Sequence, residues 1–443
     1  IRKEGSAYDL TIAIGILIAS EQIKGVNKVE DYYIMGELSL DGTLQPIRGA
    51  LSVAIEAKKR GKRGLILPAQ NAREAAIVAD IEVLGVHNIK EVIDFFNEEK
   101  EIERITINTR EEFQRSLNNY EFDFSDVKGQ ENIKRALEIA AGGGHNVILI
   151  GPPGSGKTML AKRLPSILPP LTLHEALEKK KIHSVAGKMS RYASLISIRP
   201  FRSPHHTISD VALVGGGSSP QPGEISLAHN GVLFLDELPE FKRTVLEVMR
   251  QPLEDRFVTI ARSKYSVDFP ASFMFIAAMN PCPCGNYNHP KIPCTCGQGL
   301  VQKYLNKVSG PLMDRIDIHV EVVPVTHEEL ASTKPVEKSE EIRKRVIKAR
   351  AIQNKRFAEY ERIHCNAQMS RKQVEQYCRI SVEGEELLKR AMERLGLSAR
   401  AYDRILKVAR TIADLEESPE IEIEHLSEAI NFRSLDRDNW GRR

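Results

Sequence analysis

The chain has 443 residues, of which 42% are hydrophobic and 28% are charged, and its formal net charge is +3. These values are close to the averages for soluble globular proteins, which excludes extensive disorder, and the length predicts two or three domains. Because the charges nearly balance, a polyanionic partner is neither required nor excluded, and any nucleic-acid surface must be local.

The first hundred residues predict a small α/β unit that ends near Asn97. The apolar run 10–19 is too short to span a bilayer, so we expect a buried helix there and no membrane partner. Extended segments at 32–38 and 64–67 flank a predicted helix at 48–59. We expect one domain over residues 1–97 and a charged linker over residues 98–121.

The beginning of the chain and its cysteines bear on its compartment. The sequence begins with Ile1 instead of Met, and a structured pattern follows almost at once. These features suggest that upstream residues are missing. Glu4 and Asp9 interrupt any signal-peptide pattern. Four of the six cysteines are crowded into residues 282–296, unlike the dispersed framework of a secreted disulfide protein, so we expect a cytoplasmic protein.

The middle of the chain, residues 122–325, predicts a parallel α/β core. The expected elements are helix 131–141, strand 146–151, a glycine-rich loop, helix 157–164, strand 231–235 and strand 273–279. Such alternation favours a parallel sheet with helices on its faces. After residue 325 nearly every segment has helical periodicity, so residues 326–443 should form a helical C-terminal domain.

The segment after the first core strand reads GPPGSGKT and matches a P-loop, because it follows an apolar strand and opens a helix. Backbone N–H groups of such a loop surround phosphates. Lys157 should reach the β and γ phosphates of ATP, and the Thr158 hydroxyl should bind Mg²⁺. The predicted nucleotide-binding residues of the loop are Gly151, Pro152, Pro153, Gly154, Ser155, Gly156, Lys157 and Thr158.

Two later core strands end in polar side chains. The segment GVLFLDELPEF should deliver Asp236 to the magnesium ion and Glu237 toward the water that attacks the γ phosphate. Asn280 ends the strand 273–279 at the edge where ligands of open α/β sheets bind, and it is a candidate to orient this water. The alternative for Asn280 is an ordinary turn residue before Pro281.

These motifs resemble the magnesium-chelatase-like AAA+ ATPases, most closely the competence protein ComM (YifB) family. The resemblance covers essentially the whole chain and is most specific in FRSPHHTISDVALVGGGSSPQPGEISLAHNGVLFLDE, NPCPCG and SGPLMDRIDIHVEV. It implies a AAA+ P-loop ATPase core with a helical lid, assembled into a ring, expected to be a hexamer, with ATP between subunits.

The resemblance also implies catalytic arginines. Arg315 would act on the ATP of a neighbouring subunit, and the alternative is a surface salt bridge with Asp314 or Asp317. Arg400 matches the sensor-2 position of the lid, with Arg404, one helical turn away, as the fallback.

Two inserted hairpins are implied as well, at 211–224 and 258–267. In related ring helicases such hairpins project into the central channel, so Arg262 and Lys264 are candidate contacts to single-stranded or branched DNA. The alternative is that both are solvated charges on an exposed hairpin. No residue is expected to read base sequence, so DNA binding should depend on the backbone.

The N-terminal segment resembles part of a Lon-protease-like domain, of ribosomal-protein-like α/β fold, in KEGSAYDLTIAIG and GELSLDGTLQPIRGA. Ala7 occupies the place of that family's nucleophilic serine, and Leu51 lies near the place of its lysine. Ser6 is adjacent to the serine position but does not match it. Because the Ser-Lys pair is absent, we expect no protease activity.

Cys282, Cys284, Cys294 and Cys296 form two C-x-C pairs. Four thiolates in so short a loop can hold one structural Zn²⁺, although C-x₂₋₄-C is the usual spacing. His289 is a candidate to replace one thiolate. A disulfide, which a reducing compartment disfavours, and free buried thiols are the alternatives.

Two functions of different classes follow from the resemblance. The first is a DNA motor whose ATP hydrolysis drives translocation, helicase action or branch migration during recombination of incoming DNA in natural transformation. The second is chelatase-type, ATP-dependent remodelling of a protein partner. The Lon-like segment favours the first function, because it matches the competence family and is not part of a chelatase motor.

Overall fold

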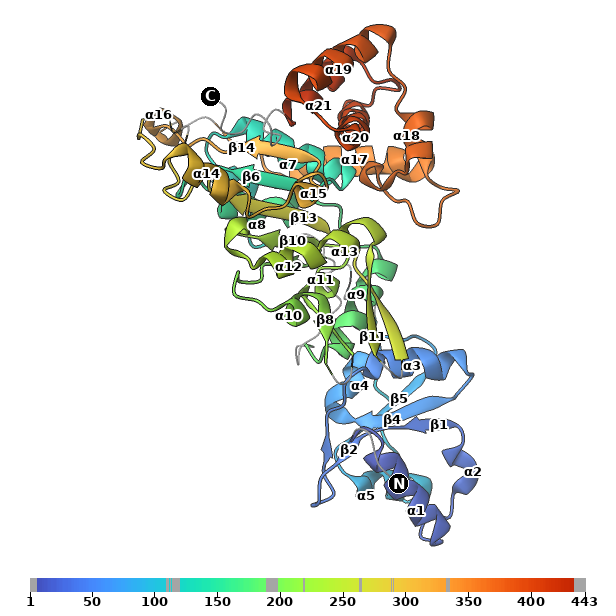
Figure 1. Ribbon diagram of the computed structural model, residues 1–443. Coiled ribbons are helices and arrows are strands. Elements are labelled where there is room, and N and C mark those ends of the chain that lie inside the picture. The colour runs from blue at the N-terminus through green and yellow to red at the C-terminus, as the bar shows by residue number, and fades with distance from the viewer. Residues whose placement is uncertain are drawn as a thin grey trace. The chain divides into compact units, whose positions relative to one another are not determined.

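The computed structural model describes residues 6–108, 111, 113, 120–188, 198–217, 220–262, 265–287, 289, 291–331 and 335–433 (Figure 1). The chain divides into two compact units, one of residues 1–118 and 171–197, the other of residues 119–170 and 198–443. The segment 171–188 therefore belongs with the N-terminal unit, although the sequence places it inside the 122–325 core. Over the described ranges, no helix combines the length and the apolar character needed to cross a membrane.

A three-stranded parallel sheet forms the centre of the first unit, in the order β1-β4-β5. Because side chains alternate along a strand, Leu65 and Leu67 of β4 pack in one apolar cluster and Ile66 packs in another. The sheet is thus covered on both faces. The elements are α1 (Asp9–Ala19), α2 (Val26–Val29), β1 (Tyr32–Ile34), β2 (Glu37–Leu38), β3 (Leu44–Gln45), α3 (Ala50–Lys59), β4 (Gly64–Pro68), α4 (Ala69–Ala75), β5 (Glu82–Val86), α5 (Ile89–Phe96) and α9 (Leu173–Val185).

The prediction of a buried helix at residues 10–19 is wrong in its burial. Helix α1 buries only Leu10 and Ile14, whereas Ile12 is 50% exposed and Ile16 is 62% exposed. Residues four apart share one helix face, so one face of α1 packs on the core, with Leu17 and Ile18 partly buried there, and the opposite face remains exposed.

Helix α9 completes the first unit. Thr172 and Glu175 form a capping box at its start. Near its end, the Ser184 hydroxyl donates a hydrogen bond to the buried Glu74 carboxylate of α4, which also accepts the Leu51 N–H of α3 at 3.0 Å. The carboxylate therefore joins three helices of this unit.

The second unit contains the predicted parallel sheet and the helical C-terminal region. Its elements are η1 (Phe124–Asp126), α7 (Glu131–Gly143), β6 (Val147–Ile150), α8 (Lys157–Ile167), β7 (Phe201–Arg202), α10 (Asp210–Val214), β8 (Gly215–Gly216), β9 (Gln221–Pro222), α11 (Glu224–Leu227), β10 (Val232–Leu235), η2 (Leu238–Glu240), α12 (Arg243–Val248), α13 (Arg250–Asp255), β11 (Phe257–Arg262), β12 (Tyr265–Pro270), β13 (Met274–Met279), α14 (Gln298–Leu305), α15 (Gly310–Met313), β14 (Ile318–Glu321), α16 (His327–Ala331), α17 (Ser339–Arg356), η3 (Asn366–Gln368), α18 (Arg371–Tyr377), α19 (Val382–Leu395), α20 (Ala399–Leu415) and α21 (Ile423–Asn431).

All five strands of the second sheet are parallel, in the order β14-β6-β13-β10-β7. Strands β6, β10 and β13 are buried along their whole length, as expected for a parallel sheet that helices cover. Ile150 pairs with Met279, and Leu235 pairs with Ala277. The carboxyl ends of these three strands therefore meet at one edge.

The C-terminal helices share the core of this sheet. Figure 1 shows α17 to α21 gathered together in orange and red. Helix α7 contacts both α17 and α20, and one apolar cluster runs from Val147 of β6 to Ile412 of α20. The predicted boundary at residue 325 separates sheet from helices but crosses a continuous core.

Both predicted hairpins are present. Strand β8 pairs antiparallel with β9, and β11 pairs antiparallel with β12, from Phe257 opposite Pro270 to Arg262 opposite Tyr265. Lys264 lies outside the described residues, as does the side chain of Arg262.

Candidate nucleotide site

The P-loop connects β6 to α8 at the carboxyl edge of the sheet. Gly154 and Gly156 have φ angles of +76° and +90°, in the region that favours glycine. A Cβ atom on Gly151 would lie 2.2 Å from the carbonyl oxygen of Val322, so the chain passes there only as glycine. Such a loop directs successive N–H groups inward, as a phosphate requires.

Lys157 opens helix α8, and its side chain turns back over the loop. Its Nζ lies 2.7 Å from the Gly151 carbonyl oxygen, 2.8 Å from the Pro152 carbonyl oxygen and 3.3 Å from Asn280 Oδ1. Burial lowers the pKa of Lys157, and the charge of Asp236 opposes this shift. Asn280, the candidate to orient the attacking water, therefore lies within reach of the P-loop lysine.

Thr158 and Asp236 bring two oxygen ligands together. Thr158 Oγ1 lies 2.5 Å from Asp236 Oδ2, although one residue belongs to α8 and the other follows β10. A hydroxyl and a carboxylate oxygen are ligands that Mg²⁺ accepts beside phosphate oxygens. These two residues fit the predicted magnesium site.

Glu237 has a left-handed backbone with a φ of +52°, which is unusual for a residue other than glycine. Its N–H donates to Asp236 Oδ1 at 2.9 Å. Its carboxylate is 58% exposed and lies 3.3 Å from His206 Nδ1. The sequence analysis assigned no role to His206, because the pairing of β7 with β10 that brings it beside Glu237 is not specified by any local pattern.

Arg315 is held inside its own subunit. Its guanidinium lies 2.6 Å from Glu254 Oε1 and donates to the Pro311 carbonyl oxygen at 2.6 Å, and the residue is only 8% exposed. The alternative of a surface salt bridge with Asp314 or Asp317 is wrong, because the partner comes from α13. Action on a neighbouring subunit would require Arg315 to exchange Glu254 for a phosphate.

The two lid arginines have different surroundings. Arg404 forms an ion pair with the buried Asp317, which also accepts the Asn146 N–H at 2.8 Å. Burial alone would raise the pKa of Asp317, but Arg404 and His145 hold it well below its usual range. Arg400 is 64% exposed, 3.7 Å from Asp314. The Arg404 guanidinium is therefore held in an internal ion pair, whereas the Arg400 guanidinium is accessible to solvent.

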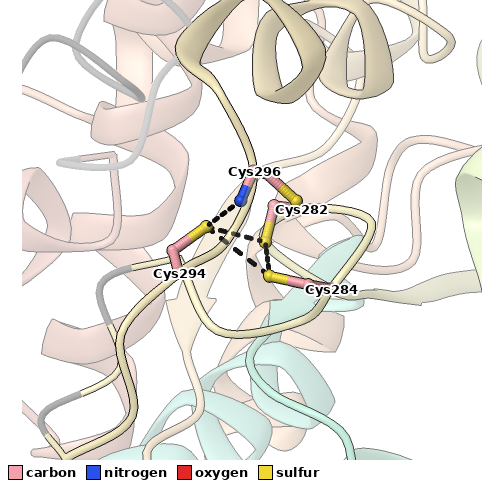
Figure 2. A group of neighbouring side chains, drawn as sticks. All are labelled: Cys282, Cys284, Cys294 and Cys296. Atoms are coloured by element: carbon pink, nitrogen blue, oxygen red, sulfur yellow. Dashed lines mark hydrogen bonds between the residues drawn. The ribbon is translucent and has the colours of Figure 1, made fainter.

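The four cysteines of the predicted zinc site converge (Figure 2). The Sγ atoms are 3.3 Å apart for Cys282 and Cys284, 3.6 Å for Cys282 and Cys294, and 3.5 Å for Cys284 and Cys294. Cys296 Sγ completes a group whose sulfur atoms all lie within 4.8 Å of one another. His289 is not needed, and its Nδ1 accepts two backbone N–H groups of its own loop. The cluster is compatible with zinc.

Ser6 and Leu51 lie beside or near the positions at which a Lon-like protease would carry its serine and lysine. Leu51 is fully buried in α3, and Ser6 donates its hydroxyl to Glu37 Oε2 at 2.6 Å.

Comparison with protein-family models matches three segments of the chain. Residues 123–330 match the family described as "Magnesium chelatase, subunit ChlI", and residues 336–433 match its C-terminal family. Residues 1–71 match "Subunit ChlI of Mg-chelatase", so the expectation that this segment is foreign to chelatase subunits is wrong, and the segment does not separate the two candidate functions.

Individual relatives are similar over nearly the whole chain. The chain is 42% identical over 436 residues to "Competence protein ComM" of Haemophilus influenzae, covering 98% of this chain and 84% of the relative. It is 44% identical over 436 residues to "Uncharacterized protein YifB" of Escherichia coli, with 98% and 83% covered. The YifB protein of Salmonella typhimurium is 42% identical over 440 residues, again with 98% and 83% covered.

Proposed function

Because the chain belongs to the ComM (YifB) family of magnesium-chelatase-like AAA+ ATPases, we propose that it is a ring-forming motor that couples ATP hydrolysis to movement along DNA. The observation that supports this most directly is the convergence of the P-loop, Asp236, Glu237 and Asn280 at the carboxyl ends of adjacent parallel strands. Ligands of open parallel sheets bind at this edge.

Each residue of the site has a defined role in the proposal. Lys157 exchanges the carbonyl oxygens of its loop for ATP phosphates, while Thr158 and Asp236 hold Mg²⁺. Glu237 accepts a proton from the attacking water, and Asn280 orients that water. The remaining residues of the phosphate cradle are Gly151, Pro152, Pro153, Gly154, Ser155 and Gly156.

The site is completed by neighbouring subunits of a homo-oligomer, which we propose is a hexamer. Arg315 reaches the ATP of the next subunit, and Arg400 of the lid contacts the nucleotide. An arginine supplied in this way accelerates phosphoryl transfer by about 10³ to 10⁵, which equals about 4 to 7 kcal/mol of barrier. The exposure of Arg400 supports its assignment over Arg404.

The DNA would be single-stranded or branched, bound without sequence preference through Arg262 and Lys264 of the β11–β12 hairpin. The named role of the Haemophilus relative as a competence protein supports recombination of incoming DNA, with translocation or branch migration, as the process. The location that we propose is the cytoplasm. Binding should weaken steeply as salt rises, because released counterions dominate backbone recognition.

We propose the domain division 1–97 for a Lon-like domain without protease activity, 98–121 for a linker, 122–325 for the AAA+ core and 326–443 for the lid, with the segment 171–188 joining the first domain. A structural Zn²⁺ bound by the four clustered cysteines belongs to the same proposal.

Steady-state ATP hydrolysis with and without single-stranded and forked DNA tests this function. We expect DNA to stimulate hydrolysis, Lys157→Ala to abolish it, and the double change Arg262→Ala/Lys264→Ala to remove only the stimulation. The pair Arg371→Ala/Lys372→Ala, on exposed positions of α18, is the control for loss of positive charge.

The second candidate is ATP-driven remodelling of a protein partner, which the chelatase family descriptions favour. In that case hydrolysis would depend on Lys157 but would not respond to DNA. Such a result would leave the nucleotide site in place and contradict the DNA motor.

A further inference from the structure

The sulfur atoms of the four cysteines lie close to the separations that one tetrahedral metal ion requires. Tetrahedral Zn²⁺ with bonds of about 2.3 Å to four thiolates holds neighbouring sulfur atoms about 3.8 Å apart. The separations in the structure are 3.3, 3.5 and 3.6 Å, and all four sulfur atoms lie within 4.8 Å of one another. A small inward or outward adjustment of each side chain would give the tetrahedral arrangement.

The loop that supplies these thiols has little else to define its shape. Its described residues between β13 and α14 contain no helix and no strand. A long loop without regular hydrogen bonding is uncommon inside a compact domain. Metal binding by such a loop contributes directly to its folding free energy.

The cysteine loop touches the P-loop. Gly285, which follows Cys284, has a φ of +81°, and a Cβ atom at this position would lie 2.4 Å from Pro153 Cδ. The Gly285 N–H also closes a turn onto the Cys282 carbonyl oxygen at 3.0 Å. The turn between the first two cysteines therefore packs against the phosphate loop where only glycine fits.

The same loop begins with a residue of the nucleotide site. Asn280 lies 3.3 Å from Lys157 Nζ, and Cys282, fully buried, follows two positions later. A metal that fixes Cys282 consequently fixes both the position of Asn280 and the surface against which Pro153 rests.

We infer that Zn²⁺ bound by Cys282, Cys284, Cys294 and Cys296 braces the P-loop, so that occupancy of the metal site sets the affinity of the chain for ATP. This inference rests on the ATP-binding part of the proposed function. The ion takes no part in hydrolysis, because its ligand set is closed.

The metal is measured first, without ATP. The chain, purified under reducing conditions without chelators, should contain about one zinc ion per subunit. Its cobalt-substituted form should show thiolate-to-cobalt charge-transfer absorption. Cys284→Ala and Cys294→Ala should each lose both signals, whereas Cys378→Ala, which removes a buried thiol from the helical region, should keep them. A chain without metal and without the cobalt signal would overturn the inference.

The effect of the zinc site on the P-loop is tested by equilibrium binding of a non-hydrolysable ATP analogue, with circular dichroism to verify folding. Cys284→Ala should weaken binding about tenfold, a change of about 1.4 kcal/mol. Gly285→Ala should keep the zinc but weaken binding similarly, because its methyl group and its backbone preference both displace the turn from Pro153. Gly297→Ala is the matched control in the same loop, since a Cβ there meets nothing within 4 Å.

The results distinguish failure of the zinc inference from failure of the proposed function. Unchanged ATP affinity in zinc-free Cys284→Ala and in Gly285→Ala would overturn the inference that zinc stabilises the P-loop. The ATPase proposal would remain. If the unaltered chain contains zinc but binds no ATP, the proposed function is wrong, and so is the inference that zinc sets the affinity for ATP.

Discussion

At the scale of single residues, each reactive group of the nucleotide site contacts a neighbouring group that fixes its position. Lys157 is fixed by loop carbonyl oxygens, Thr158 by Asp236, and Glu237 by His206. Each group therefore has a defined position before nucleotide binds, which reduces the entropy lost in assembling the reactive arrangement. In the proposed function, His206 would act through Glu237 as a positioning residue.

Glu237→Gln tests the role of this carboxylate. The amide keeps the shape of the side chain but cannot accept a proton, so kcat for ATP hydrolysis should fall by about 10²-fold or more. ATP affinity should stay near that of the unaltered chain, because Lys157 and Asp236 remain. The measurement is single-turnover hydrolysis beside equilibrium nucleotide binding. Full activity of Glu237→Gln would show that another group takes the proton.

Substitution of Arg404 should lower the free energy of unfolding, whereas substitution of Arg400 should leave it nearly unchanged. Arg404→Ala would leave the carboxylate of Asp317 buried without its cation, a loss of about 3 to 5 kcal/mol in breaking a buried pair. Arg400→Ala, at an exposed position, should change stability by less than about 0.5 kcal/mol. Urea unfolding followed through the second unit measures both. Equal stability of the two variants would contradict the structural role of Arg404.

At the scale of elements, a buried carboxylate links α9 to α3 and α4, beside the apolar contacts of Ala176 and Leu177. Glu74→Ala would leave the Leu51 N–H and the Ser184 hydroxyl without their acceptor, and each such group costs about 1 to 3 kcal/mol. Amide hydrogen exchange in α9 should therefore become about tenfold faster or more. Glu56→Ala, which removes a carboxylate of α3 whose side chain is 45% exposed, is the control. Unchanged exchange in α9 would show that its apolar contacts suffice.

Local elements were predictable because their signals are contiguous in the chain. The strand, glycine loop and helix around Lys157 form one segment, and the observed β6 and α8 follow it closely. The hairpin β11–β12 followed from the family resemblance. The membership of α9 in the first unit could not be predicted, because it depends on contacts with α3 and α4, which are distant in sequence.

Pairings across long sequence separations were missed for the same reason. His206 beside Glu237 and Glu254 beside Arg315 depend on strand order and helix packing, which no local pattern specifies. The convergence of the four cysteines was easier to expect because they lie close together in one loop, and Asn280 directly follows one strand; their roles stay predictions. Their proximity to Lys157 and Pro153 needed the sheet order β6-β13.

At the scale of the whole molecule, ring assembly would make each ATP site from two subunits, which mixing of inactive variants can test. Lys157→Ala lacks the phosphate-binding ammonium but keeps Arg315, whereas Arg315→Ala has the reverse defect. Each variant alone should be inactive. In rings mixed at equal amounts, about a quarter of the interfaces should combine an intact P-loop with an intact arginine, because closed rings pair neighbours head to tail.

ATP hydrolysis by the mixture should consequently rise to about a quarter of the unaltered activity, far above the sum of the separate variants. Glu254→Ala is the matched control for Arg315→Ala, because it removes the same ion pair but leaves the guanidinium. This control should hydrolyse ATP on its own. If mixing restores nothing while both variants still assemble, Arg315 does not act across the interface. Its burial against Glu254 and Pro311 would then be its whole role, and the arginine that completes the site must come from elsewhere in the chain.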